Sequence, residues 1–154
     1  MSKEASLEND FYAQAYQEAS KENPHFEKAH KLLLQAINKE DSRAIYALAT
    51  WYFYGQSPVV RKNIKKGVSL WQLAAKYGNS DALYDLAVCY EKGIGRHLSK
   101  KKAFEYYTRA ALAGDKQAHQ EIGRMYYYGI GVKRDRRLAS AWLDKAKELG
   151  IDED

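Results

Sequence analysis

Small and apolar residues recur along this chain at the spacing of a helix face. Ala44, Leu48 and Tyr52 follow one another at intervals of four residues, and Gly55 comes three residues later. At about 100° per residue, side chains at this spacing share one stripe of an α-helix, so the stripe predicts a buried face. A glycine just beyond it suits the left-handed conformation in which many helices end. The pattern therefore predicts a helix that stops at Gly55.

The same pattern occurs three times. The series that starts at Ala44 returns at Ala82 and Ala118, with offsets of 38 and 36 residues. A second run of small residues follows each one and ends at a glycine, namely Gly78, Gly114 and Gly150. Each repeat thus predicts two helices. The two additional residues of the first interval fall in the loop 56–62, where insertions cost little.

Residues that favour helix starts precede the expected helices of the repeats: Asp41, Asn63, Asn79, Ser99, Asp115 and Asp135. Upstream of the repeats, we expect one helix around residues 7–20. A second is expected from Asn23, as its cap, to about Asn38, with Pro24 in its first turn. Few runs of β-branched residues compete with these patterns. We predict an all-α fold of about eight helices.

The repeat resembles the Sel1-like repeat, a relative of the tetratricopeptide repeat with a longer loop. The third copy carries most of that motif, at Ala118, Ile122, Gly123, Tyr126, Gly129, Gly131, Val132, Asp135, Ala139, Trp142, Ala146 and Gly150. The first copy departs from it: Gly55-Gln-Ser replaces Gly-x-Gly, and Gly67 replaces an alanine. The resemblance covers residues 41–150 well and residues 7–40 loosely. It implies a right-handed α-solenoid of stacked antiparallel helical hairpins that binds proteins rather than performing chemistry.

We expect one repeat domain over residues 1–154. Residues 1–40 would form an N-terminal capping helix and a degenerate leading repeat, and residues 151–154 an acidic tail. Between them lie repeat 1 (41–79), repeat 2 (80–115) and repeat 3 (116–150). The sequence does not distinguish a monomer from a dimer.

Composition places the chain among soluble globular proteins. Of its 154 residues, 29% are charged and 45% are hydrophobic. Its N-terminal residues lack the apolar stretch of a secretory signal, and no apolar run is long enough to span a membrane. The single cysteine, Cys89, cannot form an internal disulfide, and we expect it to be a small buried side chain. A cytoplasmic location is the prediction.

Positions opposite the core stripe of each first helix point to a binding surface. They lie about 140–240° from the central leucine or isoleucine, so packing on that stripe does not require them to be apolar, yet aromatics recur there. In the resembling family this surface is a concave groove, and tyrosine and arginine dominate many binding sites. We predict a partner-binding groove, the groove set: Tyr46, Thr50, Phe53, Tyr54, Tyr84, Val88, Glu91, Lys92, Gln120, Arg124, Tyr127 and Tyr128. The alternative is that some of these tyrosines only pack against an adjacent repeat.

Basic residues cluster in the loop and at the start of the second helix of every repeat. Residues 41–154 hold 20 Lys and Arg against 13 Asp and Glu. Stacking would align these clusters into a basic ridge: Arg61, Lys62, Lys65, Lys66, Arg96, Lys100, Lys101, Lys102, Lys133, Arg134, Arg136 and Arg137. The ridge could be ordinary solvated surface or could attract an acidic protein. A nucleic acid ranks lower, because few aromatics are interleaved for base stacking.

Catalytic and metal-binding motifs are missing from the sequence. The four histidines lack metal-ligand spacing, and the Gly-x-Gly pairs follow helices rather than strands. We therefore predict no catalytic residue, no metal and no cofactor. The expected function is a protein-binding scaffold or adaptor that holds a peptide or a partner's helix in the groove. The alternatives are an immunity or inhibitor protein that masks a toxin or effector and, ranked lower, a nucleic-acid-binding module.

Overall fold

The computed structural model of the protein describes residues 9–151. Their helices are α2 (Phe11–Ala19), α3 (Phe26–Asn38), α4 (Ser42–Tyr54), α5 (Ile64–Lys76), α6 (Ser80–Lys92), α7 (Lys100–Leu112), α8 (Gln117–Tyr128) and α9 (Arg136–Glu148). Within the described residues no strand occurs, and a single isolated backbone bridge joins Gln56 to Val60. The prediction of an all-α fold with about eight helices is confirmed.

Most of the predicted helix starts are capped by the expected side chains. Asp41, Asn63, Asn79, Ser99 and Asp135 are N-caps whose side chains accept from first-turn N–H groups. Asp115 does the same for α8, because its carboxylate accepts from the Ala118 N–H at 2.8 Å.

The start predicted at Asn23 is wrong. The α3 helix begins after His25, whose side chain makes no capping bond. The His25 N–H instead donates to the Glu18 carbonyl at 3.1 Å, so residues 23–25 belong to the connection from α2. The Glu18 carboxylate also ties the two helices together, since it accepts from the ammonium groups of Lys21 and Lys28, both at 2.8 Å. The expected helix around residues 7–20 is α2, and residues 7 and 8 lie outside the described residues. Of the acidic tail, only Ile151 is described.

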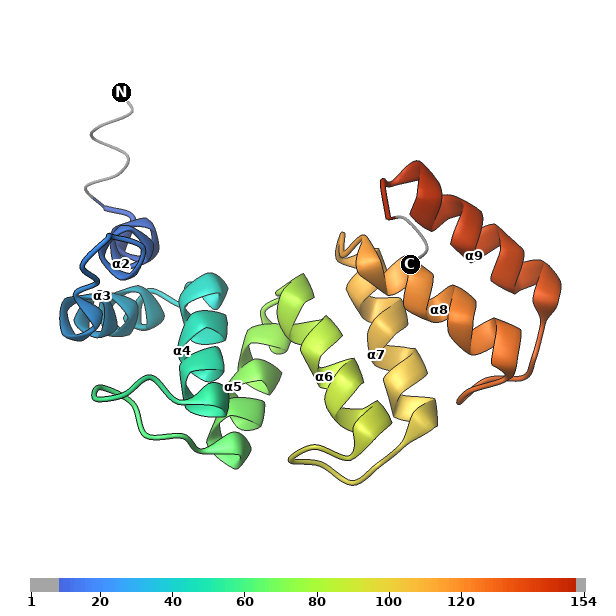
Figure 1. The fold of residues 1–154 in the computed structure, drawn as a ribbon, viewed down its shortest axis with the longest axis horizontal. Helices are drawn as coiled ribbons and strands as arrows, with labels where there is room; N and C mark the ends of the chain where they lie inside the picture. Colours follow the sequence, from blue (N-terminus) through green and yellow to red (C-terminus); the bar gives the residue numbers. More distant parts are fainter. Residues whose placement is uncertain (1–8, 152–154) are drawn as a thin grey trace. The chain divides into compact units, whose positions relative to one another are not determined.

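The chain divides into two compact units, with the boundary between Tyr77 and Gly78. In unit 1, α2 pairs with α3, α4 pairs with α5, and α3 contacts α4 (Figure 1). In unit 2, α6 pairs with α7, α8 pairs with α9, and α7 contacts α8 (Figure 1). Each unit is therefore a stack of two helical hairpins, the building block expected of a helical repeat.

Small residues let these helices approach closely. The alanines and the central leucine or isoleucine of the predicted core stripe are buried, with Ala44 and Ala82 fully inaccessible, whereas Tyr52 and Tyr126 are half-buried. Cys89 is buried as expected, and Trp51 contacts the preceding hairpin, with its ring 5.9 Å from that of Phe26. At Gly67 of α5 the neighbouring atoms are backbone atoms, and an added Cβ would lie 2.8 Å from the Phe53 amide nitrogen of α4. Spacing between α4 and α5 is thus set by the missing side chain.

Candidate protein-binding surfaces

The groove set contributes to both units, and its unit 1 members all lie on α4. Trp71 of α5 contacts three of them. Its ring centroid lies 4.6 Å from that of Phe53 and 6.3 Å from that of Tyr46, and its Nε1–H donates to the Thr50 hydroxyl at 3.4 Å. Trp71 itself is only 2% exposed. Tyr46, Thr50 and Phe53 are half-buried in this arrangement. They support the hairpin of their own repeat, whereas the packing alternative placed such contacts against an adjacent repeat.

Tyr54 differs from its neighbours because it is 69% exposed. Its ring meets Phe53 edge to face at a centroid distance of 4.9 Å. Its phenol is the most accessible part of the groove set in unit 1. An aromatic ring that is supported by a neighbouring ring and otherwise exposed to solvent is suited to bind a partner's side chain.

Unit 2 holds a network of charged and hydroxyl groups, the carboxylate network: Tyr84 and Glu91 of α6, Tyr107 of α7, and Glu121 and Arg124 of α8. The Arg124 guanidinium donates from Nη2 to both oxygens of Glu91, at 2.9 and 3.0 Å. Its Nε donates to Glu121 at 2.8 Å, and the Tyr107 hydroxyl donates to Glu91 at 3.2 Å. Glu91 and Arg124, both members of the groove set, therefore form an ion pair within the unit.

Burial and neighbouring carboxylates raise the pKa of both tyrosine hydroxyls in this network. Desolvation, followed by the negative charge of Glu121, raises the pKa of Tyr84 to about 12. Desolvation and the same carboxylate raise the pKa of Tyr107 further. Both hydroxyls stay protonated at neutral pH and act as hydrogen-bond donors, not as bases. Tyr107 and Glu121 were absent from the predicted set, although Glu121 stands at the i, i+3 spacing from Arg124 that favours a helical ion pair.

The remaining members of the groove set lie on the surface of unit 2. Val88 and Gln120 are half-buried, and Lys92 is exposed. Tyr127 and Tyr128 meet edge to face at 4.9 Å and are 39% and 67% exposed. The Arg136 guanidinium lies over the Tyr127 ring, 5.0 Å from its centroid. Tyr128 thus repeats in unit 2 the exposure that Tyr54 has in unit 1.

The basic ridge residues are exposed apart from Arg96, whose Nε is buried without a partner among the described residues. Two of them pack on core tyrosines at the same place in successive repeats: the Lys66 ammonium lies 4.2 Å from the Tyr52 ring centroid, and that of Lys102 lies 5.3 Å from Tyr90. Lys100 donates to the Glu91 carbonyl at 2.9 Å. Part of the ridge therefore contributes to packing inside the units.

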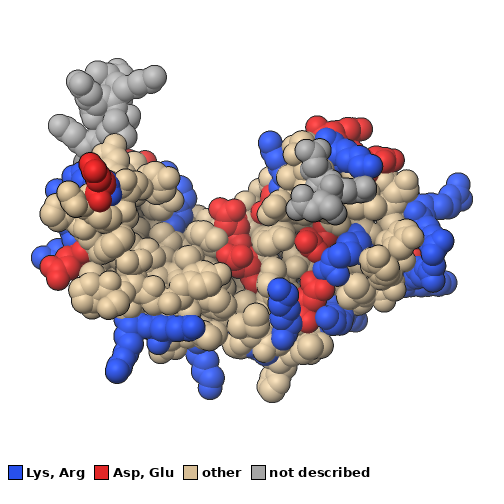
Figure 2. All heavy atoms as spheres, viewed as in Figure 1, with Lys and Arg blue, Asp and Glu red and all other residues tan. Residues whose placement is uncertain are grey.

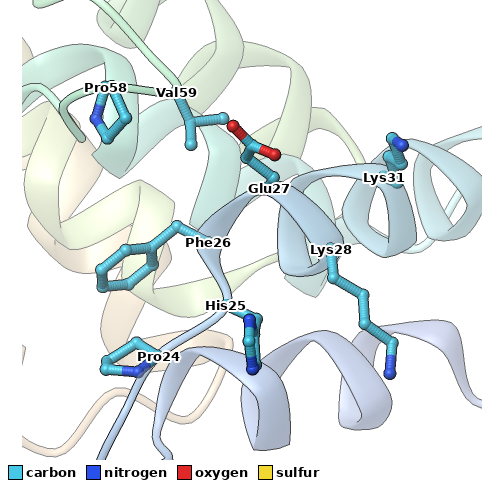
Figure 3. Close-up of a pocket in the computed structure, with 8 residues that line it drawn as sticks. All are labelled: Pro24, His25, Phe26, Glu27, Lys28, Lys31, Pro58 and Val59. Carbon is cyan, nitrogen blue, oxygen red and sulfur yellow. The ribbon is translucent and has the colours of Figure 1, made fainter.

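The loops between first and second helices differ between repeats 1 and 3. In repeat 3, Gly131 packs so closely on the backbone of Lys100 that a Cβ would collide with its carbonyl. Repeat 1 has Ser57 at the equivalent position, and its side chain rules out the same approach. The loop after α4 stands away from the preceding hairpin and leaves a cleft of about 430 Å³, the Phe26 cleft. Figure 3 shows Pro58 and Val59 facing Pro24 and Phe26 across this opening.

Charge is unevenly distributed among the repeats. Residues 42–79 contain six Lys and Arg and no Asp or Glu, whereas residues 80–115 contain six and five. Figure 2 shows basic side chains where α5 and α9 begin and acidic ones over the start of α6. The only charged side chains of residues 42–79 are therefore cationic.

The described residues offer neither a metal site nor a membrane-spanning helix. Among residues 9–151, no group of three or more His, Cys, Asp or Glu could hold a metal ion. In that same part of the chain, every helix is too short or too polar to cross a membrane.

Comparison with known proteins identifies the repeats. The Sel1 repeat model matches residues 42–79, 80–115 and 116–151. Activator of C kinase protein 1 from Saccharomyces cerevisiae is 30% identical over 80% of this chain and 23% of its own length. Chitin synthase regulatory factor 1 from Schizosaccharomyces pombe is 31% identical over 71% of this chain and 24% of its own length. The chain thus spans about a quarter of these relatives.

Solved structures agree with this assignment. A Sel1 repeat protein from Oxalobacter formigenes has a TM-score of 0.71 and 33% identity, over 78% of this chain and 90% of that one. A protective antigen of uropathogenic Escherichia coli with an SLR fold has a TM-score of 0.83 and 25% identity, over 96% of this chain and 32% of that one. The resemblance to Sel1-like repeats is confirmed.

Proposed function

Because the chain belongs to the Sel1 repeat family, we propose that it is a non-catalytic protein-interaction module that binds a segment of a partner protein through exposed tyrosines of its repeats. Tyr54 and Tyr128 occupy the same position in repeats 1 and 3. Each follows another aromatic residue at the end of a first helix. The proposed role is that of a scaffold or adaptor.

The exposure of these tyrosines carries the proposal. Tyr54 is 69% and Tyr128 is 67% exposed, although most aromatic rings of the repeats are buried or half-buried. Leaving a large ring in water forgoes the roughly 1.5–3 kcal/mol that burial of such a side chain contributes. Because Tyr54 and Tyr128 forgo this burial at the same repeat position, we infer that they bind a partner. Tyrosine is among the most effective anchors in binding sites.

The relatives support a role exercised through other proteins. One is named an activator of a kinase, another a regulatory factor of chitin synthase, and a third a component of a ubiquitin-protein ligase. Each is several times longer than this chain, so only the role of the repeats is carried over from these relatives. A non-catalytic role is supported by the carboxylate network, in which Glu91 and Glu121 are engaged in hydrogen bonds from Arg124 and Tyr107. The cytoplasmic location stays a prediction.

The experiment compares matched variants of the whole chain. Wild type and Tyr54→Ala with Tyr128→Ala are used as baits in a native lysate, and captured proteins are quantified by mass spectrometry. The control, Tyr16→Ala with Leu112→Ala, removes two equally accessible apolar side chains outside the groove set, since Tyr16 is 64% and Leu112 is 81% exposed. Circular dichroism checks that all three are folded.

We expect a partner that binds wild type and the control and is reduced at least about tenfold with the tyrosine variant, in line with the loss of two anchoring rings. Purified partner and titration calorimetry then give the affinity directly. If every captured protein is held equally by the tyrosine variant, the proposed surface is wrong.

A further inference from the structure

A second cleft opens on the other side of the loop after α4, beside Tyr54. Its volume is about 520 Å³, within the range of sites that hold small ligands or a few side chains. We call it the Tyr54 cleft; Tyr54, Ser57, Pro58, Val60, Arg61 and Lys62 line it. The ring of Tyr54 and the side chains of Pro58 and Val60 offer apolar surface, and the cations of Arg61 and Lys62 complete the lining.

Ring packing and backbone hydrogen bonds fix the residues that line the Tyr54 cleft. Phe53 supports the Tyr54 ring and itself packs on buried Trp71, with centroid distances of 4.9 and 4.6 Å. The loop is closed by two backbone hydrogen bonds between Gln56 and Val60, of 2.8 and 2.7 Å, and Val60 is only 4% exposed. A site held in this way loses little conformational entropy when a ligand binds.

The charged residues that line the Tyr54 cleft are all basic. Arg61 and Lys62 are exposed and make no ion pair with any carboxylate of residues 9–151. No carboxylate lines the cleft, and the repeat that contains it has none at all between residues 42 and 79. Uncompensated cations beside an apolar wall attract carboxylates and repel a basic partner.

Resting on the proposed function, we propose that the Tyr54 cleft binds an acidic segment of the partner protein. The segment's carboxylates pair with Arg61 and Lys62, and an apolar or aromatic side chain of the same segment packs on Tyr54 and Pro58. Arginine can hold a carboxylate through two parallel hydrogen bonds, which adds direction to the attraction.

A protein segment suits this cleft better than a nucleic acid does. Single-stranded nucleic acids are bound along extended grooves, with successive bases stacked on several rings. The Tyr54 cleft offers one exposed ring and two cations in a confined space. That combination fits two or three side chains of a peptide.

The test uses the full ¹⁵N-labelled chain and three defined probes. The first is a short synthetic peptide of alternating aspartate and glutamate with one central phenylalanine. The second has lysine in place of every acid, and the third is a single-stranded thymidine oligonucleotide of equal charge to the first. Amide chemical shifts locate binding, and fluorescence anisotropy of labelled probes gives the affinities at low and physiological salt.

Two charge-reversal variants separate a site from general electrostatics. Arg61→Glu with Lys62→Glu alters the cleft, while Lys133→Glu with Arg134→Glu makes the same charge change at the equivalent loop positions of repeat 3. We expect the acidic peptide to shift the amides of Tyr54, Arg61 and Lys62. We expect the first variant to bind the acidic peptide about tenfold more weakly than wild type. The second variant should bind it within about twofold of wild type.

Several results would overturn the proposal: no shifts at these residues, equal loss in both variants, or tighter binding of the lysine peptide or the oligonucleotide at the same amides. A partner captured through Tyr54 and Tyr128 that the acidic peptide does not displace would refute this inference and leave the proposed function standing. The absence of any tyrosine-dependent partner refutes the proposed function itself.

Discussion

Replacing Gly67 by alanine should destabilise unit 1, although alanine is the residue that Sel1-like repeats carry there. The added Cβ would lie 2.8 Å from the Phe53 amide nitrogen, 2.9 Å from the Ala49 carbonyl oxygen and 3.0 Å from the Phe53 Cα. All three are backbone atoms of α4, so no side chain can rotate away. The helices α4 and α5 must separate by roughly half an ångström to restore ordinary contact distances.

The magnitude follows from two opposing effects. Overpacking of a close contact costs about 1–3 kcal/mol. Alanine in a helix gains about 0.4–1 kcal/mol over glycine, mainly by restricting the unfolded chain. The net loss in the free energy of unfolding is about 1–2 kcal/mol, which lowers the melting midpoint of a unit of this size by several degrees. Separation of the two helices would also loosen the contact of Phe53 with Trp71.

Thermal unfolding followed by circular dichroism measures this change. Ala103→Gly, at the equivalent position of repeat 2, is the matched reverse substitution, since Ala103 is fully buried. We expect both variants to melt below wild type, because each helix pair is adapted to the residue it has. A rise in the midpoint of Gly67→Ala would show that the contact between α4 and α5 is not as close as described.

Three other predictions concern charged and reactive groups. The ammonium groups of Lys21 and Lys28 lower the pKa of the Glu18 carboxyl from 4.5 to about 2, so its stabilisation is complete above pH 4.5 and is lost as the pH falls towards 2; urea unfolding at several pH values should show a smaller acid dependence in Glu18→Gln. Arg124→Met should cost unit 2 about 2 kcal/mol in urea unfolding, because two largely buried carboxylates lose their cation; an unchanged midpoint would contradict the network. Burial raises the pKa of the Cys89 thiol to about 11, so a thiol reagent at neutral pH should react with it far more slowly in the native than in the denatured protein, and similar rates would show that the thiol is accessible.

Helix positions could be predicted from the sequence because each depends on residues close in the chain. Asn79 caps α6 by accepting from the Ala82 N–H at 2.9 Å, a contact within three residues. Gly93 and Gly129 end α6 and α8 in the left-handed conformation that the pattern required. The start predicted at Asn23 was wrong because a backbone hydrogen bond between His25 and Glu18 keeps residues 23–25 in the connection.

The candidate surface was only partly predictable. Tyr46 and Tyr54 occupy positions of the same kind on the helix that carries them. Trp71, from the next helix, covers Tyr46 and leaves Tyr54 exposed. Nothing within α4 distinguishes the two, since exposure depends on which side chain a second helix places against each ring.

By itself, the sequence determined the repeat, the helices and their ends, because periodicity, capping and glycine conformation act over a few residues. Only the tertiary structure decided which charges are free. Arg124 and Glu91 are 33 residues apart and form an ion pair, whereas Arg61 and Lys62 form none with the carboxylates of residues 9–151. The structure also decided that the loop after α4 borders the Phe26 cleft, whereas Gly131 in the loop after α8 packs on the backbone of Lys100. Such pairings and gaps depend on distances between helices, which local patterns do not encode.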